Sequence, residues 1–407
     1  MTNAYVSGMR EDLNLTGNQF NIFTTFWTCG YIVGQIPSQL VITKIRPSIW
    51  IPGAEILWAV FTFSFAAMHS EKQIYAVRFL IGLAESPFYV GAITLLGNWY
   101  TPEELGKRAT IFYSASFAAN MFSGYLQAGV YNGMNNLHGI AGWRWLFIMC
   151  GVISVPGALW GFFAVPDSPY NTRAKWLTPA EVELAKARMI REDRRPFHGV
   201  SWDVVKKLVT FNQFWPMVIA YICFCLDTYY LTFFAIWLKS LSTYSVAQIN
   251  VIPTGAAAIG LVSTILWGYL SDRLRARLPV AALITLVNVV GSLVLAIAPS
   301  RAGIFFGYFV NAATYAYGPI VLTWINETCG DRPAQRALII GVAQTMGATF
   351  SAWVPVLIFD TGTDAPLFRK GYITVTVLSV VQVSETVLPS LGWRGEKGRA
   401  DKLCDSY

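Results

Sequence analysis

The sequence predicts an all-α protein that crosses a membrane many times. Of its 407 residues, 54% are hydrophobic and only 13% are charged, which is about half the charged fraction of an ordinary soluble domain. The hydrophobic residues gather in runs of about 20, the length that a helix needs to cross about 30 Å of hydrocarbon. Such a chain cannot cover its surface with polar groups in water, so we expect a lipid bilayer around it.

Eleven apolar segments are expected as membrane helices, with five before a long polar segment and six after it. They lie near residues 19–42, 49–68, 74–98, 109–131, 144–165, 214–238, 249–270, 279–299, 302–324, 338–360 and 372–388. This order predicts an outward polar loop at 1–18, an N-terminal helical bundle at 19–165, a linker at 166–213, a C-terminal bundle at 214–388 and a tail at 389–407.

The polar segment 166–213 has the signals of a cytoplasmic linker with one helix of its own. We interpret Pro166-Asp167-Ser168-Pro169 as a helix stop. Thr178 and Glu181 are spaced as a capping box, and Pro179 suits the first helical position.

The distribution of lysine and arginine predicts the orientation. With the linker in the cytoplasm, the cytoplasmic loops and tail carry 22 basic residues and the opposite side carries 6, as the positive-inside rule requires. The carboxyl terminus is then inside and the amino terminus outside. An outward start without a preceding helix leads us to expect that an earlier helix is missing from this sequence. The net charge of +7 is interpreted as this topology signal rather than as a nucleic-acid site, because no continuous basic face with stacking aromatics accompanies it.

Two charges inside the segment 74–98 are the first functional candidates. Arg78 and Glu85 are two helical turns apart and share one face. Charges within a bilayer usually face a polar cavity and have a function. Arg78 is the candidate that holds an organic carboxylate, because guanidinium offers a planar fork of donors and stays protonated. Glu85 is the candidate for a coupling proton, because burial disfavours the charged carboxylate. The alternative is an Arg–Glu ion pair that braces the bundle.

Other polar residues on apolar segments are weaker candidates for the solute cavity. Asp227, beside Tyr229 and Tyr230, either lines the opposite cavity wall or forms a helix–helix hydrogen bond. A group of amides and one phenol either faces the solute or joins helices, as such residues often do in membranes: Gln35, Gln39, Asn120, Gln127, Asn311, Tyr315 and Gln344. Glu55, near a cytoplasmic helix end, is given no role.

The short cytoplasmic turn around Asp272 predicts a different role. It contains one acid and three bases, namely Arg273, Arg275 and Arg277. Such a turn can pair with a neighbouring helix end and lock an inner gate, and the positive-inside rule alone explains the arginines but not Asp272.

No enzyme signature is present. The sequence has no phosphate-binding loop of the Walker type, so no nucleotide cofactor is expected. Its three histidines are too scattered for a metal site, and no histidine lies near Ser86 in the sequence to activate it. Asn14-Leu15-Thr16 is a glycosylation sequon on the expected outer side.

The motifs in this order resemble the major facilitator superfamily, and more narrowly the fungal anion:cation symporter group of allantoate, nicotinate and pantothenate permeases. The resemblance runs from about Asn3 to about Gly371. It is carried by Asn3-Ala4, Gly8 to Leu13, Gln35 to Gln39, Arg46 to Trp50, Arg78 to Glu85, Trp143 to Phe147, Pro166 to Pro169 and Gly268 to Arg273. Residues 35–52 and 78–108 are most similar to pantothenate transporters. The family's first helix is absent here, and the sequence after Gly371 matches poorly.

This resemblance implies two bundles, six plus six helices in the family and about five plus six here, that rock about a midplane site. It also implies a coupling carboxylate at Glu85, a conformational latch at Asp272 and Arg273, and close helix approach at Gly268. The expected function is proton-coupled import of a small organic anion, such as a vitamin acid, across the plasma membrane. A proton-coupled exporter of a fungal metabolite and a non-transporting receptor or degenerate paralogue remain alternatives. Substrate identity and oligomeric state stay open.

Overall fold

The computed structural model describes residues 1–42, 45–100, 102–191, 214–274, 277–297, 300–328 and 333–404. These residues are mostly helical, and none of the described ones forms a strand. The chain divides into two compact units, Met1–His198 with Leu241–Val251 and Gly199–Ser240 with Ile252–Tyr407. Each unit is described by itself below.

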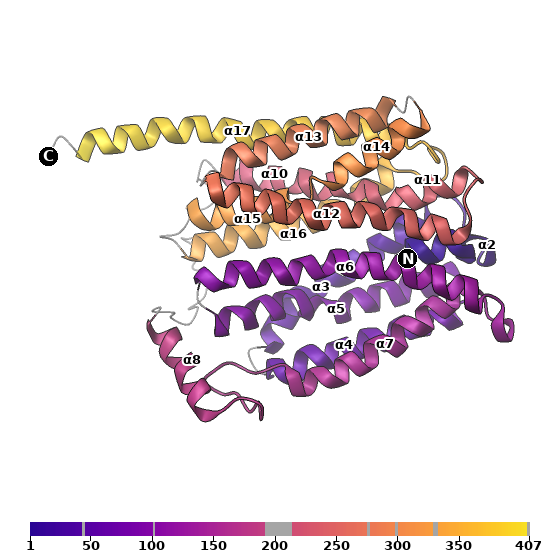
Figure 1. Ribbon diagram of the computed structural model, residues 1–407, viewed down its shortest axis with the longest axis horizontal. Coiled ribbons are helices and arrows are strands. Elements are labelled where there is room, and N and C mark those ends of the chain that lie inside the picture. The colour runs from indigo at the N-terminus through magenta and orange to yellow at the C-terminus, as the bar shows by residue number, and fades with distance from the viewer. Residues whose placement is uncertain are drawn as a thin grey trace. The chain divides into compact units, whose positions relative to one another are not determined.

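The first unit contains five long helices that coincide with the first five expected segments. They are α3 (Gln19–Ile42), α4 (Pro47–Ser64), α5 (Glu71–Trp99), α6 (Pro102–Met134) and α7 (Gly142–Ala164). The helix α3 packs along α5, and α4 packs along α7 (Figure 1). A short 3-10 turn, η2 (Phe65–Ala67), follows α4.

The first eighteen residues, expected as a polar loop, contain ordered helical turns. These are α1 (Thr2–Ala4), the π-helical η1 (Tyr5–Met9) and α2 (Arg10–Asp12). Val6 and Met9 are buried. The Asp12 carboxylate accepts a hydrogen bond from the Trp143 indole (3.0 Å) and pairs with Arg144 (3.1 Å) at the start of α7. Side chains from α7 therefore hold this segment in place.

Asp167, in the motif interpreted as a helix stop, also joins two other helices. The helix α7 ends at Ala164, as the motif predicts. Asp167 is 2% exposed. Its Oδ1 accepts from the Ser48 backbone N–H (3.1 Å) in the first turn of α4, and its carbonyl accepts from the Trp99 indole (2.7 Å) at the end of α5. An acid at a helix N-terminus accepts a hydrogen bond from an otherwise unpaired backbone N–H and interacts favourably with the helix dipole. Asp167 therefore links the start of α4 to the end of α5.

The helix of the linker begins as its sequence predicts. Thr178 and Glu181 form the capping box of α8 (Pro179–Arg191): the Thr178 N–H and hydroxyl donate to Glu181 Oε2 at 2.8 and 2.7 Å. The Glu181 N–H donates back to the Thr178 hydroxyl (3.3 Å). The backbone hydrogen bond from Thr178, followed by that from its side chain, lowers the pKa of Glu181.

The second unit contains the remaining segments, and two of them are interrupted. The segment 214–238 consists of α10 (Phe214–Asp227), the 3-10 stretch η4 (Thr228–Phe233) and α11 (Phe234–Ser240). The segment 302–324 is divided into α14 (Arg301–Ala312) and α15 (Tyr317–Thr328). Both interruptions lie within apolar segments that the sequence predicts as single helices.

The other helices of this unit are uninterrupted. They are α12 (Val246–Leu274, which begins in the first unit), α13 (Arg277–Ile297), α16 (Pro333–Ile358) and α17 (Arg369–Cys404). The helix α13 packs beside α17, and α10 packs against both α16 and α17 (Figure 1). The helix α17 continues past residue 388, where the sequence predicts the tail.

Seven helical stretches in the described part of the chain are long and apolar enough to cross a membrane, among them α5, α7 and α12. All eleven expected segments fall on helices. The all-α membrane fold class predicted from the sequence is therefore confirmed.

Candidate substrate and proton sites

Arg78 and Glu85 meet one aromatic side chain of the neighbouring helix α3. The Trp27 indole N–H donates to Glu85 Oε2 (2.9 Å). The Arg78 guanidinium carbon lies 5.8 Å from the centre of the Trp27 ring, near the outer limit of a cation–π contact, and Arg78 Nε donates to the Phe23 carbonyl (3.3 Å). Trp27 thus links the two charges across the α3–α5 interface.

Further polar groups continue along the same face of α3. Trp27, Tyr31 and Gln35 recur every four residues, which places them on one side of a helix. The Trp27 and Tyr31 rings stack with centroids 5.4 Å apart, and Tyr31 hydrogen-bonds Gln35. Gln35 is therefore connected to Glu85 through Tyr31 and Trp27, without contacting it directly.

Small residues let α3 and α5 approach closely enough for these contacts. A Cβ added at Gly30 would overlap the Phe79 carbonyl oxygen, one at Gly82 the Trp27 carbonyl oxygen, and one at Gly34 the Ser86 hydroxyl. The sequence thus places Gly30 and Gly34 four residues apart against Gly82 and Ser86, also four apart. This is the small-xxx-small packing of membrane helices.

Asp227 is the centre of a separate polar cluster in the second unit. It is 2% exposed at the last position of α10. Its Oδ2 accepts from the Asn288 amide of α13 (2.8 Å) and contacts the Ser379 hydroxyl of α17 (3.0 Å). Its Oδ1 has no hydrogen-bond partner. The helix–helix hydrogen bond, one of the two sequence interpretations, is present.

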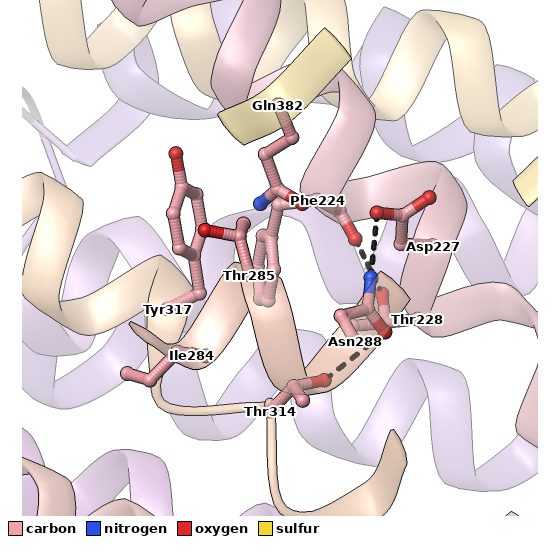
Figure 2. Close-up of a pocket in the computed structure, with 9 residues that line it drawn as sticks. All are labelled: Phe224, Asp227, Thr228, Ile284, Thr285, Asn288, Thr314, Tyr317 and Gln382. Atoms are coloured by element: carbon pink, nitrogen blue, oxygen red, sulfur yellow. Dashed lines mark hydrogen bonds between the residues drawn. The ribbon is translucent and has the colours of Figure 1, made fainter. Parts of the chain in front are cut away.

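A small, partly open cavity adjoins Asp227 (Figure 2). Most of its lining side chains carry oxygen: Asp227, Thr228, Thr285, Asn288, Thr314, Tyr317 and Gln382, with Phe224 and Ile284. The Thr314 hydroxyl donates to Asn288 Oδ1 (3.4 Å), so the turn between α14 and α15 closes one side of the cluster. The other interpretation, that Asp227 lines the solute cavity, stays a prediction.

The weaker candidates are scattered. Asn120 is exposed on α6, and Gln344 is half-buried on α16. Gln127 is fully buried on α6. Asn311 is buried against Gly291, where an added Cβ would overlap its amide, which is a packing role. Gln39 lies outside the described side chains.

The gate residues differ in detail from the expectation. Arg277, at the start of α13, pairs with Asp272 and donates to the Ser271 hydroxyl (3.0 Å), whereas Arg273 is exposed. A Cβ at Gly268 would meet no described atom within 4 Å, and the role of Gly268 in close helix approach stays a prediction. Arg275 lies outside the described residues. Asn14, the sequon residue, is exposed with φ of 49°, and its glycosylation stays a prediction.

Several of these features are not evident from the sequence read locally. Nothing in the sequence near Trp27 indicates that it contacts Glu85, because that contact depends on how α3 packs against α5. The Gly30 and Gly34 spacing is a signal that indicates this contact. Asn288 is the one amide on the strongly apolar helix α13, which marks it as a candidate. Ser379 is one of several polar residues on α17, and no local signal distinguishes it.

Apolar helices in two units, with charged and amide side chains buried inside them, define a multi-pass membrane transporter. The chain belongs to the Major Facilitator Superfamily, whose family model matches residues 1–355. The pantothenate transporter liz1 of Schizosaccharomyces pombe is 32% identical over 98% of this chain and 78% of its own length. The pantothenate transporter FEN2 of Saccharomyces cerevisiae is 32% identical over 91% of this chain and 74% of its own.

Solved structures show the same fold at low sequence identity. A D-xylose-proton symporter superimposes with a TM-score of 0.71 at 14% identity, over 95% of this chain and 93% of that one. A bacterial homologue of the human lysosomal transporter Spinster, inward-facing and unoccupied, gives 0.72 at 15% identity, over 95% and 92%. The relatives and the fold are those of membrane transporters rather than enzymes.

Proposed function

We propose that this protein imports a small organic anion of the pantothenate type together with protons, by alternating access at the plasma membrane. The observation that carries the proposal is the Trp27 bridge between Arg78 and Glu85. It puts an anion-binding group and a proton-binding group in one contact network inside apolar helices.

Arg78 would hold the substrate carboxylate. Its Nε donates to the Phe23 carbonyl, which orients the guanidinium, and guanidinium is the side-chain group whose planar fork of donors matches a carboxylate. Lysine cannot reproduce this planar recognition. The names of two relatives, both pantothenate transporters, support a carboxylate of this class.

Glu85 would carry the proton. The Trp27 indole is a donor only, so it stabilises the ionised carboxylate, while the surrounding apolar helices stabilise the neutral acid. A carboxyl group balanced in this way responds to changes in access to water. Proton binding at Glu85 and anion binding at Arg78 then offset each other's charge.

The test is uptake of labelled pantothenate and nicotinate into yeast that lacks its own carriers, at external pH 5 and pH 7. We expect saturable uptake that is faster at pH 5, loss of that pH dependence in Glu85→Gln, and a raised KM in Arg78→Lys. Glu55→Gln is the matched control, because Glu55 is a half-buried acid on α4 outside this network and should keep the pH dependence.

Two outcomes would count against the proposal. Absence of uptake by protein that reaches the cell surface would exclude import of these two acids. A Glu85→Gln variant that transports with unchanged pH dependence but loses thermal stability would show that Glu85 braces the bundle instead.

A further inference from the structure

Two interrupted helices converge on Asp227 in the second unit. The helix α10 ends at Asp227 and passes into the 3-10 stretch η4, and the chain turns between α14 and α15 at residues 313–316. The Tyr315 hydroxyl donates to the Thr228 carbonyl (3.5 Å) and so joins the two interruptions. In transporters, ion sites commonly lie where membrane helices are broken.

The carboxyl group of Asp227 has no compensating charge in the described part of the chain. Its hydrogen-bond partners, Asn288 and Ser379, are both neutral, and Oδ1 is buried without a partner. An isolated buried carboxylate is among the most costly groups to keep in an apolar interior. This arrangement indicates that a cation accompanies the negative charge.

The hydrogen bonds around Oδ2 accommodate a proton without any movement of heavy atoms. Asn288 Nδ2 donates one hydrogen bond to Asp227 Oδ2 and one to Ser379 Oγ, each at 2.8 Å. With Asp227 ionised, the single hydrogen of the Ser379 hydroxyl points to Oδ2 (3.0 Å). With Asp227 neutral, Oδ2–H donates to Ser379 Oγ, and the hydroxyl turns to the Val375 carbonyl at 2.9 Å.

We propose that Asp227 is a second proton site of this transporter, separate from Glu85, with the proton on Oδ2 in the Asn288–Ser379 cluster. The proton comes from bulk water and returns to it, so only the Oδ2–H bond forms and breaks. Protonation reverses the direction of the Asp227–Ser379 hydrogen bond, which joins α10 and α17. The inference goes beyond the proposed function, because it depends on neither Glu85 nor the identity of the anion.

Other titratable groups surround Asp227 and must be distinguished from it. The groups that interact with it electrostatically are Cys223, Cys225, Tyr230 and Tyr317. Glu385 on α17, Tyr315 and Tyr372 lie one contact further away. Phenols stay neutral between pH 5 and pH 8, and so do thiols in apolar surroundings. The described side chains of α16 carry no titratable group. Glu385 is therefore the acid to control for.

The test is infrared difference spectroscopy of the full chain in lipid, without substrate, as the pH is switched between 8 and 5. We expect wild-type protein to show the C=O stretch of newly protonated carboxyl groups. Asp227→Asn should lose one component of that band, while Glu85→Gln and Glu385→Gln retain it. A band from Asp227→Asn that keeps every component would overturn the proposal.

A second variant keeps the test decisive if Asp227→Asn fails to fold. Ser379→Ala retains the acid and removes one hydrogen bond from Oδ2, so the same component should shift in frequency; an unshifted band would contradict the assignment. Sodium added at pH 8 should leave the spectrum unchanged. A sodium-induced change in the carboxylate bands that is absent from Asp227→Asn would make this a sodium site and overturn the assignment to a proton.

Discussion

The close approach of α3 and α5 gives the most demanding prediction, for Gly82→Ala. A Cβ at this position would overlap the carbonyl oxygen of Trp27. Because the obstacle is helix backbone rather than a flexible side chain, the two helices must separate by about 1 Å or more before ordinary van der Waals contact is restored.

The magnitude follows from that separation. Forcing a methyl group into a packed interface costs about 1–3 kcal/mol, and a rigid backbone neighbour places Gly82→Ala at the upper end. The Trp27–Glu85 hydrogen bond spans the same gap at 2.9 Å. Widening the gap by about 1 Å takes it beyond hydrogen-bonding distance, so both stability and the pH dependence of uptake should change.

The assay is the thermal midpoint of solubilised protein, measured by fluorescence-detected size exclusion, with uptake at two pH values alongside. For units of this size, each kcal/mol lowers Tm by about 2–4 °C. Gly129→Ala on α6 is the matched control, because an added Cβ there would meet no described atom within 4 Å and alanine favours helix by about 0.5–1 kcal/mol. A Gly82→Ala protein as stable as Gly129→Ala would refute the packing argument.

Three further predictions follow from individual contacts. Trp27→Phe keeps an aromatic ring but removes the indole N–H that donates to Glu85. We therefore expect a shifted pH dependence of uptake and a free energy of unfolding lowered by about 1–3 kcal/mol. Unchanged uptake at every pH would count against the Trp27 bridge. Arg277→Gln removes the ion pair with Asp272, whose side chain is largely exposed. We expect a loss of stability of no more than about 1 kcal/mol, because exposed ion pairs contribute little. A larger decrease in Tm would contradict this expectation. The pKa of Glu181 is lowered in the folded protein from its ordinary value of 4.5. The stability that its carboxylate gives to α8 is therefore fully present above about pH 4.5, and it is lost as the pH falls through the pKa of the folded state. Glu181→Ala removes the acceptor of both Thr178 hydrogen bonds, so hydrogen exchange in the first turn of α8 should rise at pH 7; equal exchange in the two proteins would exclude a role for this cap.

The sequence predicts the helices of this protein well because the bilayer restricts the choice. A run of about 20 apolar residues in lipid must satisfy its backbone internally, so the expected segments coincide with helices. The capping box at Thr178 and Glu181 is also predictable, since its donors and acceptors lie within four residues. Local spacing alone fixes both features.

Contacts between distant segments are much less predictable. Arg78 and Glu85 can be placed on one face of a helix, but Trp27 lies more than fifty residues away in the chain. The same holds for Asp227 with Asn288 and Ser379. Helical periodicity indicates which face a residue occupies and leaves open which helix that face meets.

The interruptions after Asp227 and at residues 313–316 are also absent from the apolar pattern. Both segments are hydrophobic on average, and a hydrogen bond from Tyr315 to Thr228 joins the two interruptions. Mean hydropathy does not report such a break, because the apolar residues on either side of it keep the average high.

Measurement of proton flux shows whether an anion and a proton cross together and whether Glu85 carries the proton. Purified protein in liposomes with a pH-sensitive dye inside would receive external pantothenate with no initial pH gradient. We expect wild type and Glu55→Gln to acidify the lumen, and Glu85→Gln not to acidify it even where that variant exchanges labelled substrate. Pantothenate entry by wild-type protein without any acidification, or equal acidification by Glu85→Gln, would contradict this expectation.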